Sequence, residues 1–169
     1  HLVLRRQRQM CIRDSDETLL TQESPSRIPD LRLHDGGRWA VAVHFEGWSK
    51  QDILAAPTSK LLKEGESALQ PVAIGYEARF EPQFVHGDAL YMISTLGNSG
   101  GALWKVDLWH PERENWQQVF TPAEGSVLQS ASYCRGELVL TVEREAATQF
   151  FVSNLQGDSI RPVPLPGIG

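Results

Sequence analysis

The stretch that decides the fold is HGDALYMISTL, residues 86–96. A glycine beside a polar residue is followed here by a run rich in apolar and β-branched side chains. Glycine supplies the positive φ that a tight hairpin requires, so we expect a strand on each side of this turn. The same pattern occurs in DGGRWAVAVHF, residues 35–45, and in CRGELVLTVER, residues 134–144.

These three turns form a repeat of nearly constant length. Gly37 and Gly87, the glycines that precede the polar residue, are 50 positions apart, and Gly87 and Gly136 are 49 apart. A period of about 50 residues is typical of propeller blades, in which each repeat is one four-stranded sheet. The sequence therefore predicts an all-β fold, a partial β-propeller of about three four-stranded antiparallel blades.

Other strand-like runs fit this unit. The first repeat shows two runs joined by a turn at 47–50, whereas the second and third repeats show four each: 39–44 and 53–56; 80–85, 90–94, 102–108 and 116–120; 127–133, 138–142, 150–153 and 160–163. We expect eight prolines at strand ends or connections, where the missing N–H does no harm: Pro57, Pro71, Pro82, Pro111, Pro122, Pro162, Pro164 and Pro166. Residues 58–69 contain helix-forming side chains, but we expect a loop there.

The composition is that of an ordinary globular protein. Of the 169 residues, 41% are hydrophobic and 22% are charged, which argues against a disordered or fibrous chain. The net charge of −5 gives no electrostatic reason to expect nucleic acid or an anionic membrane as a partner. No apolar run reaches the roughly 20 residues of a membrane-spanning helix. The subcellular compartment stays open.

The first fifteen residues differ from the rest. HLVLRRQRQMCIRDS contains four Arg and one Asp, and without it the net charge is −8 rather than −5. Apolar residues precede the arginines, which is the wrong order for a targeting segment. Residues 9–15 resemble a translated transposon end of the kind used to prepare sequencing libraries. We therefore expect residues 1–15 to be an assembly artefact, absent from the native gene, and residues 16–169 to form the propeller domain.

The two cysteines carry little chemistry in this interpretation. Cys11 lies in the suspect segment, which leaves Cys134 without an intrachain disulfide partner. A lone cysteine is usually a small buried hydrophobe, so we expect Cys134 to be inert.

Several phrases resemble the propeller of prolyl oligopeptidases. They are DGGRW (35–39), GWSKQDI (47–53), GDALY (87–91), PERENW (111–116) and LPGIG (165–169), in the order and spacing of that family. The resemblance implies a seven-bladed propeller that caps an α/β-hydrolase domain and restricts its Ser-Asp-His site to short peptides, cut after proline. It implies that the hydrolase domain begins after residue 169, so this chain has no catalytic residue, cofactor or metal of its own.

One loop departs from the family pattern. Where the family shows Thr-Asn and then Gly-Ala-Pro-Arg, this chain has Thr95-Leu96-Gly97-Asn98-Ser99-Gly100-Gly101-Ala102. The loop fits the G-x-S-x-G nucleophile pattern, and GNSGG resembles the serine motif of chymotrypsin-like proteases. A trypsin-like protease that uses Ser99 is therefore a distant alternative.

The catalytic alternative requires a base near Ser99. A serine hydroxyl becomes a nucleophile only when a histidine, itself oriented by a carboxylate, takes its proton. The upstream candidates are His34, His44, His86, Asp52 and Asp88, and none lies in a phrase resembling the catalytic segments of such proteases. Residues 102–107 alternate like a strand rather than a helix, which is wrong for a hydrolase elbow. We expect a glycine-rich hairpin loop and an unactivated Ser99.

The histidines show no metal-ligand spacing, so we expect His44, His86 and His110 to be surface or hydrogen-bonded side chains. Two functions remain open. The first is the propeller of a prolyl oligopeptidase-type serine endopeptidase, with an α/β-hydrolase domain and short peptides as partners. The second is a non-catalytic propeller that binds peptides or proteins.

Overall fold

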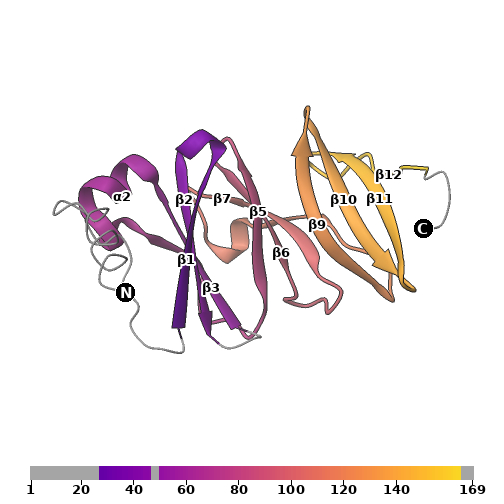
Figure 1. Cartoon of the computed structure of the whole chain (residues 1–169), viewed down its shortest axis with the longest axis horizontal. Coiled ribbons are helices and arrows are strands. Elements are labelled where there is room, and N and C mark those ends of the chain that lie inside the picture. Colours follow the sequence, from indigo (N-terminus) through magenta and orange to yellow (C-terminus); the bar gives the residue numbers. More distant parts are fainter. Residues whose placement is uncertain (1–26, 47–49, 165–169) are drawn as a thin grey trace, which may run out of the picture.

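The computed structural model describes residues 27–46 and 50–164. They form three four-stranded antiparallel sheets that follow one another along the chain and along the long axis of the molecule (Figure 1). The expected N-terminal artefact, residues 47–49 of the expected turn and the LPGIG phrase lie outside the described residues.

Each sheet takes its strands in sequence order, as a propeller blade does. The first sheet contains β1 (Arg27–His34), β2 (Trp39–Glu46), β3 (Lys50–Pro57) and β4 (Gln70–Ala73). The second contains β5 (Phe80–His86), β6 (Ala89–Ser94), β7 (Ala102–Asp107) and β8 (Gln117–Phe120). The third contains β9 (Ser126–Cys134), β10 (Glu137–Arg144), β11 (Ala147–Asn154) and β12 (Arg161–Pro162). The predicted fold class is confirmed.

The repeat glycines lie in the hairpins that the spacing predicted. Gly87 joins β5 to β6 with a φ of 62°, and Gly136 joins β9 to β10 with a φ of 90°. In the first sheet, Gly36 and Gly37 lie in the short 3-10 turn Asp35–Gly37 between β1 and β2, with φ of 64° and 90°. These left-handed conformations are costly for residues with a side chain, which explains why glycine marks the repeat.

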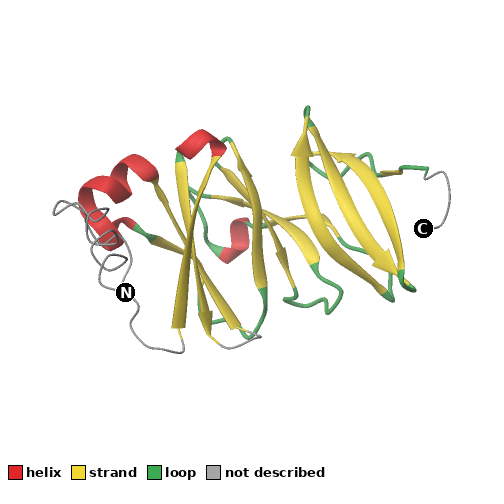
Figure 2. Ribbon diagram, viewed as in Figure 1, coloured by secondary structure: helices red, strands yellow, loops and turns green. Residues whose placement is uncertain are grey.

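One prediction is wrong: residues 58–69 are helical rather than a loop. They contain α2 (Thr58–Glu64) and the 3-10 turn Gly65–Ala68 (Figure 2). The helix forms because it covers part of the first sheet, where Leu61 and Ala68 bury against Ala40 and Ala56. The sequence pattern did not predict two strands of this sheet, β1 and β4.

Pro82 also departs from expectation, because it lies inside β5 rather than at a strand end. It is tolerated because β5 is the edge strand of the second sheet and its pairing with β6 shifts register between Pro82 and Phe84. At an edge or a bulge, a residue without an N–H leaves no ladder hydrogen bond unmade.

The hydrophobic cores lie between sheets. One cluster joins the first two sheets and includes Trp39, Phe80 and Leu90, which are at most 1% exposed. A second cluster joins the second and third sheets and includes Tyr91 and Leu138. Because each sheet buries its face against a neighbour, the sheets stabilise one another as in other repeat proteins.

Polar side chains also cross between the sheets. The Gln51 amide oxygen accepts the Phe80 N–H at 2.9 Å, which links β3 to β5. Asp88 Oδ1 accepts hydrogen bonds from Arg38 Nη2 at 2.8 Å and from Trp39 Nε1 at 3.1 Å. Asp88 therefore ties the second sheet to the hairpin of the first.

Candidate functional site

The GNSGG motif forms the loop between β6 and β7, within a single sheet, as expected for a hairpin connection. Ser99 is exposed there. The Gly100 N–H donates to the Asn98 side-chain oxygen and the Gly101 N–H donates to the Asn98 carbonyl, both at 2.9 Å. Because an oxyanion hole needs unoccupied backbone N–H groups, these two donors are poorly suited to that role.

The glycines of this loop have a packing role. A side chain on Gly100 would place Cβ 2.3 Å from the carbonyl oxygen of Ser126, the first residue of β9. The Gly100 carbonyl in turn accepts the Leu128 N–H at 2.8 Å. The loop therefore holds the third sheet against the second, which explains closely spaced glycines without catalysis.

The hollow beside Ser99 contains no histidine among the described residues that line it: Asn98, Gly100, Pro122, Ala123, Glu124, Gly125, Ser126 and Val127. The loop contacts the third sheet, whereas His44 and Asp52 belong to the first sheet. Of the carboxylates considered, Asp52 accepts the Gly75 N–H at 3.0 Å and Asp88 is bonded to Arg38 and Trp39. Each carboxylate thus has a structural partner.

The histidines have different surroundings. His110 is exposed, with Nδ1 3.3 Å from Asp107 Oδ2, and the His86 ring lies 4.4 Å from the Tyr133 ring. The expectation for His44 is wrong, because it is 8% exposed and neither ring nitrogen has a hydrogen-bond partner in the described part of the chain. Its position on β2, beside buried alanines, accounts for the burial.

The expected burial of Cys134 is also wrong, because this residue is exposed. It ends β9 beside the turn at Arg135 and Gly136, and it is an exposed free thiol. Turn-flanking positions project into solvent, so the general preference of cysteine for the interior does not apply here.

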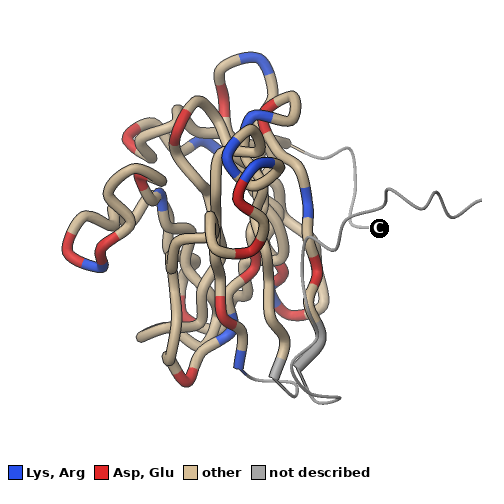
Figure 3. The backbone as a smooth tube through the Cα atoms, turned by 90° about the vertical axis from the view of Figure 1, so that its left-hand side faces the viewer, with Lys and Arg blue, Asp and Glu red and all other residues tan. Residues whose placement is uncertain are grey.

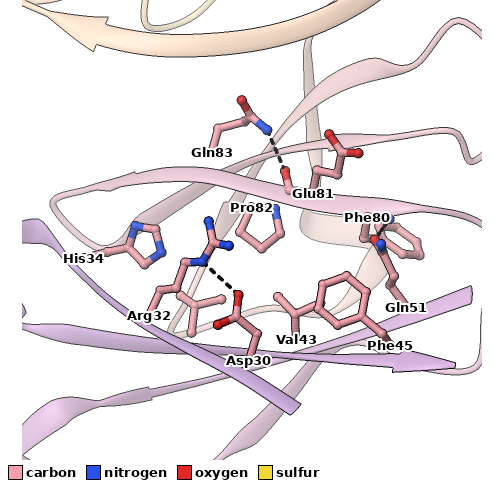
Figure 4. Close-up of a pocket in the computed structure, with 11 residues that line it drawn as sticks. Asp30, Arg32, His34, Val43, Phe45, Gln51, Phe80, Glu81, Pro82 and Gln83 are labelled. Atoms are coloured by element: carbon pink, nitrogen blue, oxygen red, sulfur yellow. Dashed lines mark hydrogen bonds and ion pairs between the residues drawn. The ribbon is translucent and has the colours of Figure 1, made fainter. Parts of the chain in front are cut away.

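A pocket of about 290 Å³ opens between the first and second sheets (Figure 4). Its polar side comes from β1, where Asp30, Arg32 and His34 alternate along the strand and face the second sheet. Alternate residues of a strand share a face, so the three side chains form one row. This row places three chemically active side chains along one side of the pocket.

Two charged groups of this row, Asp30 and Arg32, form an ion pair. Arg32 Nε donates to Asp30 Oδ2 at 2.8 Å, while both terminal guanidinium nitrogens have no hydrogen-bond partner within the described residues. Burial, and secondly the Arg32 charge, lower the pKa of His34 below 6.5. Its Nε2 is buried and has no partner among those residues either.

Apolar side chains complete the lining: Val43 and Phe45 of β2 lie beside the row on the same sheet, where Val43 pairs with Asp30, and Phe80 and Pro82 of β5 lie on the facing strand. Gln83 completes the rim. Its amide oxygen accepts the Ala131 N–H of the third sheet at 3.0 Å, and its amide nitrogen donates to the Glu81 carbonyl at 3.2 Å. The pocket wall is therefore connected to all three sheets.

This pocket escaped the sequence analysis because no strand was predicted before Asp35. The signal was present in residues 27–34, RIPDLRLH, where polar and apolar residues alternate. In the second and third repeats a strand precedes the marker glycine, and the same rule would have placed a strand before Gly37.

Other site types receive no support from the described residues. They contain no group of three or more His, Cys, Asp or Glu side chains that could hold a metal ion. No helix in the described ranges is long and apolar enough to cross a bilayer. Figure 3 shows acidic and basic residues interspersed along the backbone rather than gathered in a region of one sign.

Comparison with solved structures places this geometry among known proteins. One structure, from a mechanistic study of two prolyl endopeptidases, superposes with a TM-score of 0.75 at 25% identity over 86% of this chain. Prolyl oligopeptidase B from Galerina marginata superposes with a TM-score of 0.72 at 14% identity with a 35mer substrate bound, and 0.71 at 15% without a ligand. The sequence matches no protein-family model, and no curated protein is significantly similar to it.

Three consecutive sheets that share their cores define the class of this protein as a partial β-propeller. Its fold is that of the propeller region of prolyl oligopeptidases. The chain spans about 20% of the length of the first of these structures.

Proposed function

We propose that this chain is the substrate-gating part of a prolyl oligopeptidase-type serine endopeptidase that acts on short proline-containing peptides. In this proposal the catalytic Ser-Asp-His residues belong to an α/β-hydrolase domain outside residues 16–169, and the propeller limits which peptides reach it. The observation that carries the proposal is the superposition on a prolyl endopeptidase over 86% of the chain.

The test of this function uses the uninterrupted gene. Full-length protein should cleave a proline-containing fluorogenic peptide and should discriminate against the same sequence within a large folded protein. The 169-residue chain alone should show no turnover. A gene without a hydrolase domain, or a full-length protein without activity on any proline-containing peptide, would contradict the proposal.

A separate prediction concerns Ser99. Because its loop has a packing role and none of the described residues that line the hollow beside it is a histidine, Ser99 should not react with a serine-directed phosphonate. Ser99→Ala should leave full-length turnover within about twofold of the wild type. Labelling of the chain alone that disappears in Ser99→Ala would instead support a trypsin-like protease.

The second candidate function is a propeller that binds peptides or proteins without chemistry. The pocket of Figure 4 favours it, because side chains of the first and second propeller sheets line it. Further blades in place of a hydrolase domain in the gene would select this alternative.

A further inference from the structure

We propose that the pocket between β1 and β5 binds the free C-terminal carboxylate of a peptide whose last side chain is apolar. The inference rests on the proposed function only in taking the ligand to be a peptide. The preference for a carboxylate beside an apolar group comes from the pocket itself.

Arg32 is the anchor for the carboxylate. Its side chain is 69% exposed, yet the Asp30 carboxylate holds Nε at 2.8 Å and thereby orients the guanidinium plane. The two terminal nitrogens, unpartnered in the described chain, present parallel N–H groups. This geometry matches the two oxygens of a carboxylate, which arginine recognises through paired charge-assisted hydrogen bonds.

A second donor lies beside this anchor. Figure 4 shows the His34 ring next to the Arg32 guanidinium, both near Pro82. A neutral imidazole can carry its proton on the unpartnered Nε2. A buried polar atom without a partner is costly, so a ligand oxygen that accepts from Nε2 would relieve that cost.

Each of the two acidic groups of the pocket has an arginine beside it. Asp30 binds Arg32, and Glu81 Oε1 lies 3.0 Å from Arg79 Nε. The two arginines offset the two acidic charges, and the Arg32 and His34 nitrogens that lack a partner in the described chain favour an anionic ligand over an ammonium group.

The apolar wall specifies what accompanies the carboxylate. Val43 and Phe45 lie beside the polar row on the same sheet, and Phe80 and Pro82 lie on the facing strand β5, around a space of about 290 Å³. Such a space accommodates a side chain and a carboxylate but no large chain segment. Burial of an apolar C-terminal side chain against these residues supplies the hydrophobic contribution to binding.

The experiment is isothermal titration calorimetry on the 169-residue chain with N-acetyl-Ala-Pro-Leu, offered with a free carboxylate or as the C-terminal amide. The free acid should bind about tenfold more tightly than the amide, as expected for loss of a hydrogen bond to a charged group. A peptide ending in Gly should bind several-fold more weakly than the one ending in Leu.

Variants locate the effect. Arg32→Gln should weaken the acid about tenfold and abolish the difference between acid and amide. The matched control is Arg161→Gln, another exposed arginine with a 2.8 Å partner, Glu137, on the third sheet, and it should leave both affinities unchanged. Circular dichroism spectra identical to the wild type would show that both variants fold.

Equal binding of acid and amide, no binding of either, equal loss in both variants, or equally tight binding of inorganic sulfate would overturn the inference. None of these results would bear on the proposed peptidase, whose test is turnover by the full-length protein. Conversely, carboxylate binding would stand even if the gene encoded no hydrolase domain.

Discussion

At the residue scale, Gly100 has no space for a side chain. A Cβ atom added there would lie 2.3 Å from the Ser126 carbonyl oxygen, and the obstacle is backbone that cannot rotate away. Gly100→Ala should therefore lower the free energy of unfolding by roughly 1–3 kcal/mol, as overpacking typically does. Chemical denaturation followed by tryptophan fluorescence would measure the change.

The neighbouring residue is the control for that prediction. Ser99 is exposed, so Ser99→Ala should shift stability by less than about 0.5 kcal/mol. Equal losses in both variants would show that the whole loop, rather than the close approach at Gly100, sets the cost.

Tyr91 gives a prediction in alkaline solution. Its hydroxyl donates to the Leu155 carbonyl at 3.1 Å, and burial raises the pKa of Tyr91 to about 12. The unfolded chain releases this proton near pH 10, whereas the folded chain retains it. The stability contributed by neutral Tyr91 is therefore complete below pH 10 and is lost as the pH rises from about 10 to about 12.

Comparison with Tyr91→Phe tests this dependence. Wild-type stability should fall more steeply than that of Tyr91→Phe across this interval, in denaturation curves recorded at several pH values. In a pH titration followed by tyrosinate absorbance, the variant should lack the ionisation near pH 12 that belongs to Tyr91. Parallel pH profiles would contradict the assignment.

At the element scale, α2 is held by one leucine. Leu61 is 1% exposed, whereas its neighbour Leu62 is 61% exposed. Leu61→Ala should destabilise the protein by about 2–5 kcal/mol through lost burial and a cavity, whereas Leu62→Ala should be nearly neutral. Thermal unfolding of the two variants measures the difference, and similar melting temperatures would refute this packing of α2.

Elements also show what the sequence could reveal. The spacing of Gly37, Gly87 and Gly136 predicted three hairpins. Each turn needs a positive φ, and few residues other than glycine adopt that conformation readily. The spacing could not predict α2, whose formation depends on the tertiary contact of Leu61 with the first sheet. Local propensity is a weak guide where packing decides.

The pocket was harder to predict for a related reason. Arg32 and Phe80 are far apart in the sequence, and they line one cavity only because two sheets pack face to face. Alternation could have placed the polar row on one face of β1, but no local pattern identifies Phe80 and Pro82 of β5 as the residues opposite it.

At the scale of the whole molecule, the third sheet is attached to the second through close backbone contacts. Gly157 follows β11 and has a φ of +84°, and a Cβ atom added to it would lie 2.0 Å from the Val119 carbonyl oxygen on β8. Gly157→Ala should loosen the third sheet while leaving the first in place. Hydrogen exchange should accelerate in β10 but remain unchanged in β2.

Gly125 is the matched control for this prediction. Its φ of +75° is equally strained, but nothing lies within 4 Å of the position that a Cβ atom would take. Gly125→Ala should cost about 1–2 kcal/mol from backbone strain without the selective loss of protection in β10. Uniform acceleration across all three sheets in Gly157→Ala would mean that the molecule opens as a single unit.

Asp88 has a consequence for the fidelity of folding. The residue after the marker glycine is Arg38 in the first repeat, Asp88 in the second and Glu137 in the third, and Arg38 pairs with Asp88 while Glu137 pairs with Arg161. Repeat proteins with similar units are prone to misassembly, in which one unit takes the place of another. If the third sheet took the place of the second, Arg38 would lie beside Glu137, which already pairs with Arg161. Divergence at this one turn position thus distinguishes neighbouring repeats that otherwise share the same backbone plan.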